Sequence, residues 1–320
     1  MPLTFDWSET ISTLPSNPIP ADWLASKGKG VKVAFIDTGV NLGLPSLTHL
    51  NIGGRKFFTG APGFSVTKLV GQDLVGEVFG GTGTGHGTLY ASFLAGKSPD
   101  SSTDEIELVN GIAPAADWYI IKARNPNDKK TTIQNLLNAL ELSANLGIEV
   151  AITGQCISAS EMAFEGLTDA ELDRVFGLPG LKKMFVFAPL KNLESTDTWD
   201  LITSDNIPSR RLEIFNVAKL PDNFGPLADV IQNQPIPFLL SGFQGKVLSK
   251  TGDAIDLAFS NSGAVAIMGG IAVLALSFFK TQNGGALPTR DGMLQLLGNT
   301  SQSLNNASSP FAQPAFFKNF

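Results

Sequence analysis

A long apolar segment in the last quarter of the chain constrains the fold more than any other feature of the sequence. From Gly263 to Phe279 every residue except Ser277 is apolar or small. A run of this length is at the lower limit of what crosses a bilayer, but Gly269 and Gly270 lie in its middle and no second candidate span accompanies it. We therefore expect a helix that is buried on all sides in the protein core, and no membrane partner.

The remaining apolar segments alternate between strand-like and helix-like patterns. Short buried strands are predicted at residues 31–36, 118–121, 149–152, 184–188 and 214–218. Helices are predicted at residues 86–96, 132–146, 161–176, 263–279 and 289–297. This alternation predicts an α/β fold, a three-layer sandwich whose mostly parallel central sheet has helices on both faces. We expect a single domain over residues 1–320, in which residues 1–30 form an extended lead-in.

Composition narrows the class of protein. The formal charge is −6 and the pI is near 5.0, which argues against nucleic acid as a partner, because Lys and Arg must neutralise phosphates there. Cys156 is the only cysteine, so no intrachain disulfide forms, as is typical of a reducing compartment. The first residues show no signal-peptide pattern. These features favour a cytoplasmic location, or secretion if the N-terminus has been trimmed.

The two histidines differ in their surroundings. His49 lies between apolar neighbours, so we expect a structural or surface role. His86 lies in the segment Gly83–Thr88, where small residues leave room for another part of the chain to approach the imidazole. An accessible imidazole is suited to general base catalysis. The alternative is a glycine-rich loop that contains a histidine without a chemical role.

An aspartate and a serine complete a possible catalytic set. Asp37 ends the first predicted strand, at the edge of a parallel sheet where catalytic groups gather, and a buried carboxylate there needs a partner such as a histidine. Ser262 begins the long apolar helix, whose backbone N–H groups can stabilise an oxyanion. The alternatives are a turn-capping aspartate and an ordinary N-cap serine. Asp37-Thr38-Gly39 also resembles the aspartic protease triplet, but those enzymes need two and this sequence has one.

The order Asp, His, Ser and the surrounding segments resemble the subtilase family over nearly the whole chain. The segments that carry the resemblance are 29–40 around Asp37, 85–88 around His86, 111–114, 262–264 with Gly270, and 287–300. The resemblance implies a serine endopeptidase that acts on a peptide or protein through an acyl-enzyme. In it Ser262 is the nucleophile, His86 the general base, and Asp37 the residue that orients the histidine.

The resemblance also implies further site residues. Asn192 corresponds to the oxyanion donor of the family, and Pro189 and Leu190 just before it are expected to bind substrate. Gly154, Gln155 and Cys156 take the place of the family's substrate-binding strand. No cofactor is implied. The calcium-binding carboxylate of the family falls on Ser46, so no metal site is predicted, and the acidic residues Asp100, Asp104, Glu105 and Glu107 are expected to form a solvated loop.

Several positions depart from the family pattern. Lys191 replaces a glycine, Ser260-Asn261 replaces Gly-Thr, and Ala266 replaces a proline. These departures favour narrow processing specificity. They also leave open a catalytically impaired pseudoprotease that binds peptides or a protein. A third alternative is a cysteine hydrolase that uses Cys156.

Overall fold

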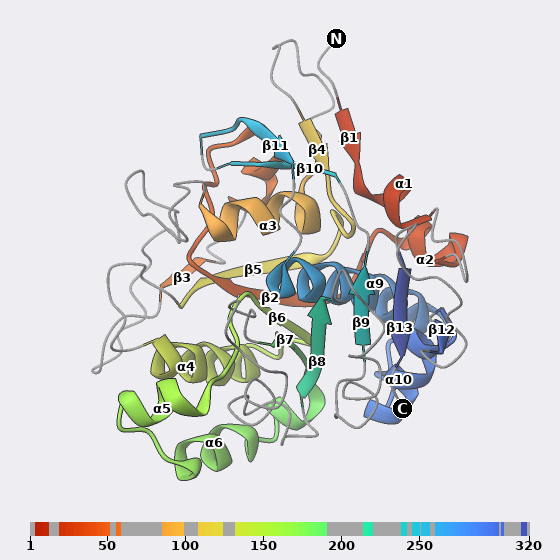
Figure 1. Ribbon diagram of the computed structural model, residues 1–320. Helices are drawn as coiled ribbons and strands as arrows, with labels where there is room; N and C mark the ends of the chain where they lie inside the picture. Colours follow the sequence, from red (N-terminus) through yellow and green to blue (C-terminus); the bar gives the residue numbers. More distant parts are fainter. Residues whose placement is uncertain are drawn as a thin grey trace.

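Figure 1 shows the protein as a computed structural model. The structure describes residues 4–12, 19–51, 56–58, 85–98, 108–123, 132–190, 214–219, 238–241, 245–249, 251–256, 260–300, 302–303 and 315–318.

The described residues build one central sheet of nine strands in the order β12-β13-β9-β8-β7-β6-β2-β5-β3. The strands are β2 (Lys32–Asp37), β3 (Lys56–Phe58), β5 (Asp117–Lys122), β6 (Val150–Thr153), β7 (Phe185–Pro189), β8 (Ile214–Lys219), β9 (Phe238–Ser241), β12 (Gln302–Ser303) and β13 (Ala315–Lys318). Neighbouring strands are parallel except β9 and β13. The five predicted strands are all present and form the middle of the sheet.

Helices cover both faces of this sheet, which confirms the predicted three-layer architecture (Figure 1). The helices are α1 (Trp7–Ser12), α2 (Ala21–Ser26), α3 (His86–Ala95), α4 (Thr132–Asn145), α5 (Ala159–Phe164), α6 (Asp169–Phe176), α9 (Asn261–Gln282) and α10 (Arg290–Gly298), with short 3₁₀ helices at η1 (Pro45–Asn51) and η2 (Leu181–Lys183). One hydrophobic core joins α2, α3 and α9 to the sheet. A second core lies on the opposite face, beneath α4 and α6.

The long apolar segment is the core helix α9. By length and composition it could cross a membrane, but it is almost wholly buried inside the protein and packs on β6, β7 and β8. Its two glycines allow this close approach. A Cβ on Gly269 would lie 2.6 Å from Cδ1 of Ile152 in β6, and one on Gly270 would lie 3.1 Å from Cγ2 of Ile112. The helix that carries Ser262 is therefore held directly against the sheet.

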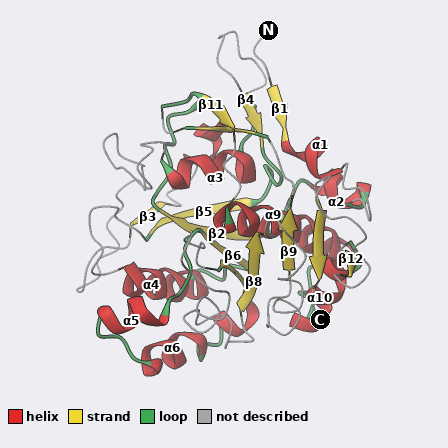
Figure 2. Ribbon diagram, viewed as in Figure 1, coloured by secondary structure: helices red, strands yellow, loops and turns green. Residues whose placement is uncertain are grey.

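Two expectations about local structure are wrong. The helix predicted at residues 161–176 is two helices, α5 and α6, separated at Gly166, whose φ of +72° is not helical. The lead-in at residues 1–30 is not simply extended, because it contains α1 and α2 (Figure 2). Trp7 and Trp23 of these helices are buried in the core, so packing stabilises helices too short to form alone.

Smaller strand pairs lie outside the main sheet. β1 (Thr4–Asp6) pairs in parallel with β4 (Leu108–Asn110), which attaches the N-terminal segment to the α3 side of the protein. β10 (Lys246–Leu248) and β11 (Ala254–Asp256) form an antiparallel hairpin that also packs on α3. Together these pairs cover the helix that begins with His86.

Candidate active site

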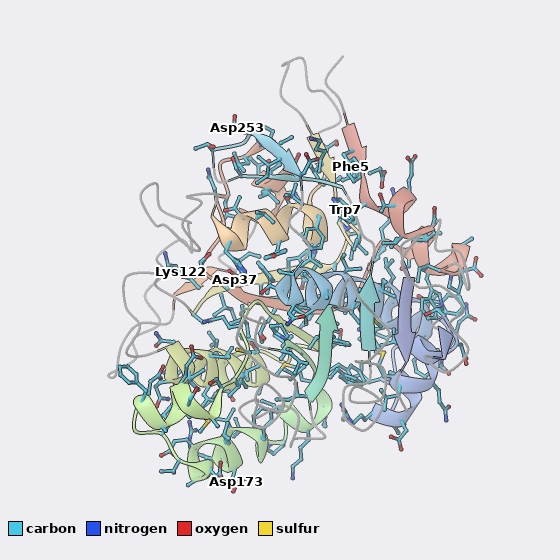
Figure 3. All side chains as sticks on the ribbon, in the orientation of Figure 1. Phe5, Trp7, Asp37, Lys122, Asp173 and Asp253 are labelled. Carbon is cyan, nitrogen blue, oxygen red and sulfur yellow. The ribbon has the colours of Figure 1, made fainter. Side chains whose placement is uncertain are left out.

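Asp37 is the last residue of β2 and is buried, with 1% of its surface exposed. Its Oδ1 atom accepts a hydrogen bond of 2.6 Å from the backbone N–H of Thr38. Lys122, its register partner on β5, is also buried, and both lie at the same edge of the sheet (Figure 3). Asp37 therefore sits at the carboxyl edge of the parallel sheet, as the sequence predicts.

The structure brings Asp37 and His86 together. Nδ1 of His86 lies 2.8 Å from Oδ1 and 2.9 Å from Oδ2 of Asp37. An ionised carboxylate only accepts hydrogen bonds, so Nδ1–H donates and the lone pair of a neutral imidazole is on Nε2. The His86 side chain is 14% exposed, whereas that of Asp37 is buried. The imidazole is thus oriented from the buried side and remains accessible on the other.

Glycine and threonine position this pair. His86 is the first residue of α3, and a Cβ on the next residue, Gly87, would overlap the backbone oxygen of Gly39. The absence of a side chain at Gly87 lets α3 begin in contact with the end of β2. The N–H of Gly87 donates a 2.9 Å hydrogen bond to Oγ1 of Thr38. The sequence Asp37-Thr38-Gly39 therefore supplies the carboxylate and also the two residues, Thr38 and Gly39, that contact the first turn of α3.

Ser262 lies in the first turn of α9 and is 7% exposed. The N-cap of this helix is Ser260, whose Oγ accepts a 3.3 Å hydrogen bond from the N–H of Gly263. The alternative interpretation of Ser262 as an N-cap is therefore wrong, because the cap lies two residues earlier. The hydroxyl of Ser262 instead donates a 3.0 Å hydrogen bond to the carbonyl oxygen of Gly154.

Gly154 is the common neighbour of the three predicted triad residues. Its carbonyl accepts from Ser262, and a Cβ at its Cα would overlap Oδ2 of Asp37 and lie 3.1 Å from Cε1 of His86. Its own N–H is bonded to the carbonyl of Ile36 on β2. The three side chains, which are far apart in the sequence, thus converge around one glycine at the end of β6.

The two residues after Gly154 differ in exposure. Gln155 is 5% exposed, and its buried amide oxygen has no hydrogen-bond partner among the described residues. Cys156 is partly exposed. Pro189, the last residue of β7, and Leu190 after it are buried, and their contact with a substrate stays a prediction. Asn192 lies outside the described residues and stays a prediction.

Residues expected to have other roles are also placed. Ser46 is buried, and its Oγ accepts a 3.3 Å hydrogen bond from the N–H of Val109. His49 lies in η1, where burial lowers the pKa of its imidazole. Within the described part of the chain, no group of three or more His, Cys, Asp or Glu side chains could hold a metal ion. Asp100, Asp104, Glu105 and Glu107 lie outside that part.

Comparison with known sequences finds similarity to one family along the first half of the chain. Residues 28–170 match the profile of the Subtilase family, a range that includes Asp37, His86 and Gly154 and ends before Ser262. An intracellular serine protease of Paenibacillus polymyxa is 31% identical over 180 residues, which are 50% of this chain and 49% of that protein. Subtilisin BL of Lederbergia lenta is 34% identical over 127 residues, 39% of this chain and 36% of that protein. The chain therefore spans about half or less of these relatives.

Solved structures resemble the whole fold. The epidermin leader peptide processing serine protease of Staphylococcus aureus is 17% identical, with a TM-score of 0.57 over 91% of this chain and 77% of that chain. The prenylagaramide maturation protease PagA is 20% identical, with a TM-score of 0.53 over 85% of this chain and 86% of that chain. At these identities the likeness shows the fold alone.

The two kinds of comparison complement each other. The family profile covers the strands and the helix that carry Asp37 and His86, and the structural neighbours share the architecture into which α9 and Ser262 fit. The structural neighbours agree with the α/β architecture described above. Residues 28–170 therefore match the subtilase family, and the chain has the subtilisin-like fold.

Proposed function

We propose that this protein is a serine endopeptidase that hydrolyses peptide bonds through an acyl-enzyme on Ser262. The observation that carries the proposal is the convergence of Asp37, His86 and Ser262 around Gly154. This set of residue types is the one that nucleophilic serine catalysis requires: a hydroxyl, a base, and a carboxylate that orients the base.

In the proposed reaction, the Ser262 hydroxyl rotates from the Gly154 carbonyl toward Nε2 of His86 when a substrate binds. His86 accepts its proton as Ser262 Oγ attacks the peptide carbonyl, and returns it to the leaving amine. Asp37 holds Nδ1–H and stabilises the imidazolium that forms. Catalytic hydrogen bonds are often incomplete without substrate, so the resting bond to Gly154 is compatible with this role.

The first turn of α9 supports the developing oxyanion. Ser262 lies at the positive end of a 22-residue helix, where the backbone N–H of Ser262 can donate to the tetrahedral intermediate. We propose Asn192 as the second donor, on the resemblance of its segment to the family. Replacing such a donor by alanine costs about 10²–10³ in kcat. Asn192→Ala is therefore expected to lower kcat by that factor with little change in KM.

We further propose that the enzyme processes a narrow set of peptides. The amide oxygen of Gln155, one residue from Gly154, supports this, because a buried acceptor that has no partner among the described residues favours a substrate group that donates to it. Two structural neighbours are named as a leader peptide processing protease and a maturation protease. One curated relative is named as an intracellular serine protease, in line with a cytoplasmic location.

The nucleophile is tested by labelling with a fluorophosphonate probe. We expect wild-type protein to be labelled and Ser262→Ala and His86→Ala to lose labelling, since each removes about 10⁶ in rate from a complete triad. His49→Ala is the matched control, because it removes the other histidine and is expected to keep the wild-type rate. A folded wild-type protein that is not labelled but binds peptides would replace this proposal with a pseudoprotease.

Specificity is tested separately with a library of peptides. Wild-type enzyme is expected to cleave few sequences, with a preference for a side chain that donates hydrogen bonds. Gln155→Leu is expected to lose that preference while it keeps the wild-type rate of fluorophosphonate labelling. Cleavage of most library members by the wild type would contradict narrow specificity and leave the catalytic proposal intact.

A further inference from the structure

Tyr90 lies one helical turn after His86 on α3, so the two side chains share a face of the helix. Their rings make an edge-to-face contact, with centroids 4.6 Å apart and an interplanar angle of 73°. On its other side Tyr90 contacts Phe93, with centroids 5.6 Å apart. Tyr90 is 5% exposed, which leaves little of it to touch a substrate.

The hydroxyl of Tyr90 reaches the helix that carries Ser262. It lies 2.9 Å from Oγ of Ser260, the N-cap of α9. Ser260 Oγ accepts from the N–H of Gly263, and a hydroxyl oxygen has a second lone pair for the phenol. Burial raises the pKa of Tyr90 to about 12, so the phenol keeps its proton at neutral pH and can donate.

We propose that Tyr90 is a positioning residue that fixes the His86 imidazole relative to Ser262 by linking α3 to the first turn of α9. The inference rests on the proposed serine protease function. Hydrogen bonding between Nδ1 and the Asp37 carboxylate fixes one side of the imidazole, and the contact with the Tyr90 ring restricts its tilt. The bond to Ser260 then sets the distance between the two helices that supply base and nucleophile.

This link depends on a position where the sequence departs from the family pattern. A chain with glycine at position 260 has no hydroxyl there and cannot make the bond to Tyr90. In this chain the serine that replaces the glycine has two contacts: it caps α9 and it contacts the phenol. The departure from the family pattern at position 260 therefore adds a contact between α3 and α9.

The experiment measures the second-order rate constant of fluorophosphonate labelling, which needs a working Ser262 and His86 but no particular peptide. Tyr90→Phe keeps the ring and removes the bond to Ser260, and Ser260→Gly removes the same bond from the other side. Each is expected to lower the rate about 2- to 10-fold, the range that one hydrogen bond supplies. Ser260→Gly also removes the N-cap of α9, so it is expected to be the slower of the two. The double variant is expected to be no slower than Ser260→Gly, because that variant already lacks the bond to Tyr90.

Two further variants separate positioning from a general effect on folding. Ser260→Thr keeps the hydroxyl and the N-cap, so it is expected to retain the wild-type rate. Tyr119→Phe removes the hydroxyl of the second tyrosine in the chain, on β5, and is also expected to label at the wild-type rate. Rates are compared per folded molecule, with the folded fraction measured by circular dichroism.

The outcomes distinguish this inference from the function on which it rests. If Tyr90→Phe labels as fast as wild type, or if the two single effects multiply in the double variant, the positioning role is overturned while the proposed function stands. If folded wild type is not labelled at all, both are overturned. Lower rates in both single variants with rescue by Ser260→Thr support the positioning role.

Discussion

Replacing Gly87 by alanine tests whether the contact between α3 and the end of β2 holds the Asp37–His86 pair together. The new Cβ would overlap the backbone oxygen of Gly39 and lie 3.2 Å from Oδ1 of Asp37. A backbone oxygen cannot rotate away, so the first turn of α3 must shift. His86 is the first residue of that turn, and we expect its distance from Asp37 to increase.

The expected effects on stability and activity differ in size. Overpacking costs about 1–3 kcal/mol, and alanine recovers about 1 kcal/mol of helix propensity, so the free energy of unfolding falls by about 0–2 kcal/mol. A domain with a usual stability of about 5–15 kcal/mol stays folded after such a loss. A displacement of about 1 Å in a catalytic group can cost about 10²-fold in rate. Activity is therefore expected to fall much more than the folded fraction.

The assay combines urea unfolding with the rate of fluorophosphonate labelling per folded molecule. Gly292→Ala is the matched control, since it also introduces a Cβ in the first turn of a helix, α10, where the nearest atoms are Cβ of Pro288 and Oγ1 of Thr289 at 3.3 Å. We expect the control to label at the wild-type rate. A Gly87→Ala protein that labels as fast as the control would refute the argument that this contact positions His86.

Three further predictions follow from other contacts. Thr38→Val removes the acceptor for the N–H of Gly87, so the free energy of unfolding is expected to fall by about 1–3 kcal/mol in urea titrations; an unchanged midpoint would contradict the importance of this bond. Cys156→Ser is expected to keep wild-type labelling and peptide cleavage, and a large loss of both would favour a cysteine nucleophile. Burial raises the pKa of Tyr90 from its ordinary 10 to about 12, so the phenol ionises first in the unfolded chain. The contribution of the protonated phenol to the free energy of unfolding is therefore complete below pH 10 and is lost as the pH rises toward 12. Between pH 9 and 11 the wild type is expected to lose about 1 kcal/mol more than Tyr90→Phe in chemical denaturation, and equal losses would show that the phenol titrates normally.

The middle of the fold could be predicted from the sequence because its signals are local. Each of the five central strands is a short apolar run, and burial on both faces makes such runs continuous. The long helix α9 was equally clear from its composition. The strands β9 and β13, near one end of the sheet, and the helices α1 and α2 were not predicted, because each is short and is stabilised by contacts with distant segments.

Part of the candidate site could also be predicted, because some of its residues lie in segments that are recognisable locally in the sequence. Asp37 and His86 lie in distinctive segments, and the structure places them in contact. Two serines precede the apolar run, and the sequence could not show that Ser260 caps α9 and that the hydroxyl of Ser262 donates to the carbonyl of Gly154. Tyr90 was missed, although its place four residues after His86 on the same helix was a usable signal. The role of Gly154 as common neighbour follows only from tertiary structure.

The most direct test of the account is to identify the residue that a fluorophosphonate modifies. Wild-type protein is treated with the probe, digested, and mapped by tandem mass spectrometry. The account predicts a single phosphonylated residue, Ser262, and no adduct after the protein has been unfolded in urea, because the reactivity depends on His86 and Asp37 in the folded site. An adduct on Cys156 or on another serine, or a folded protein without any adduct, would contradict the assignment of Ser262 as the nucleophile.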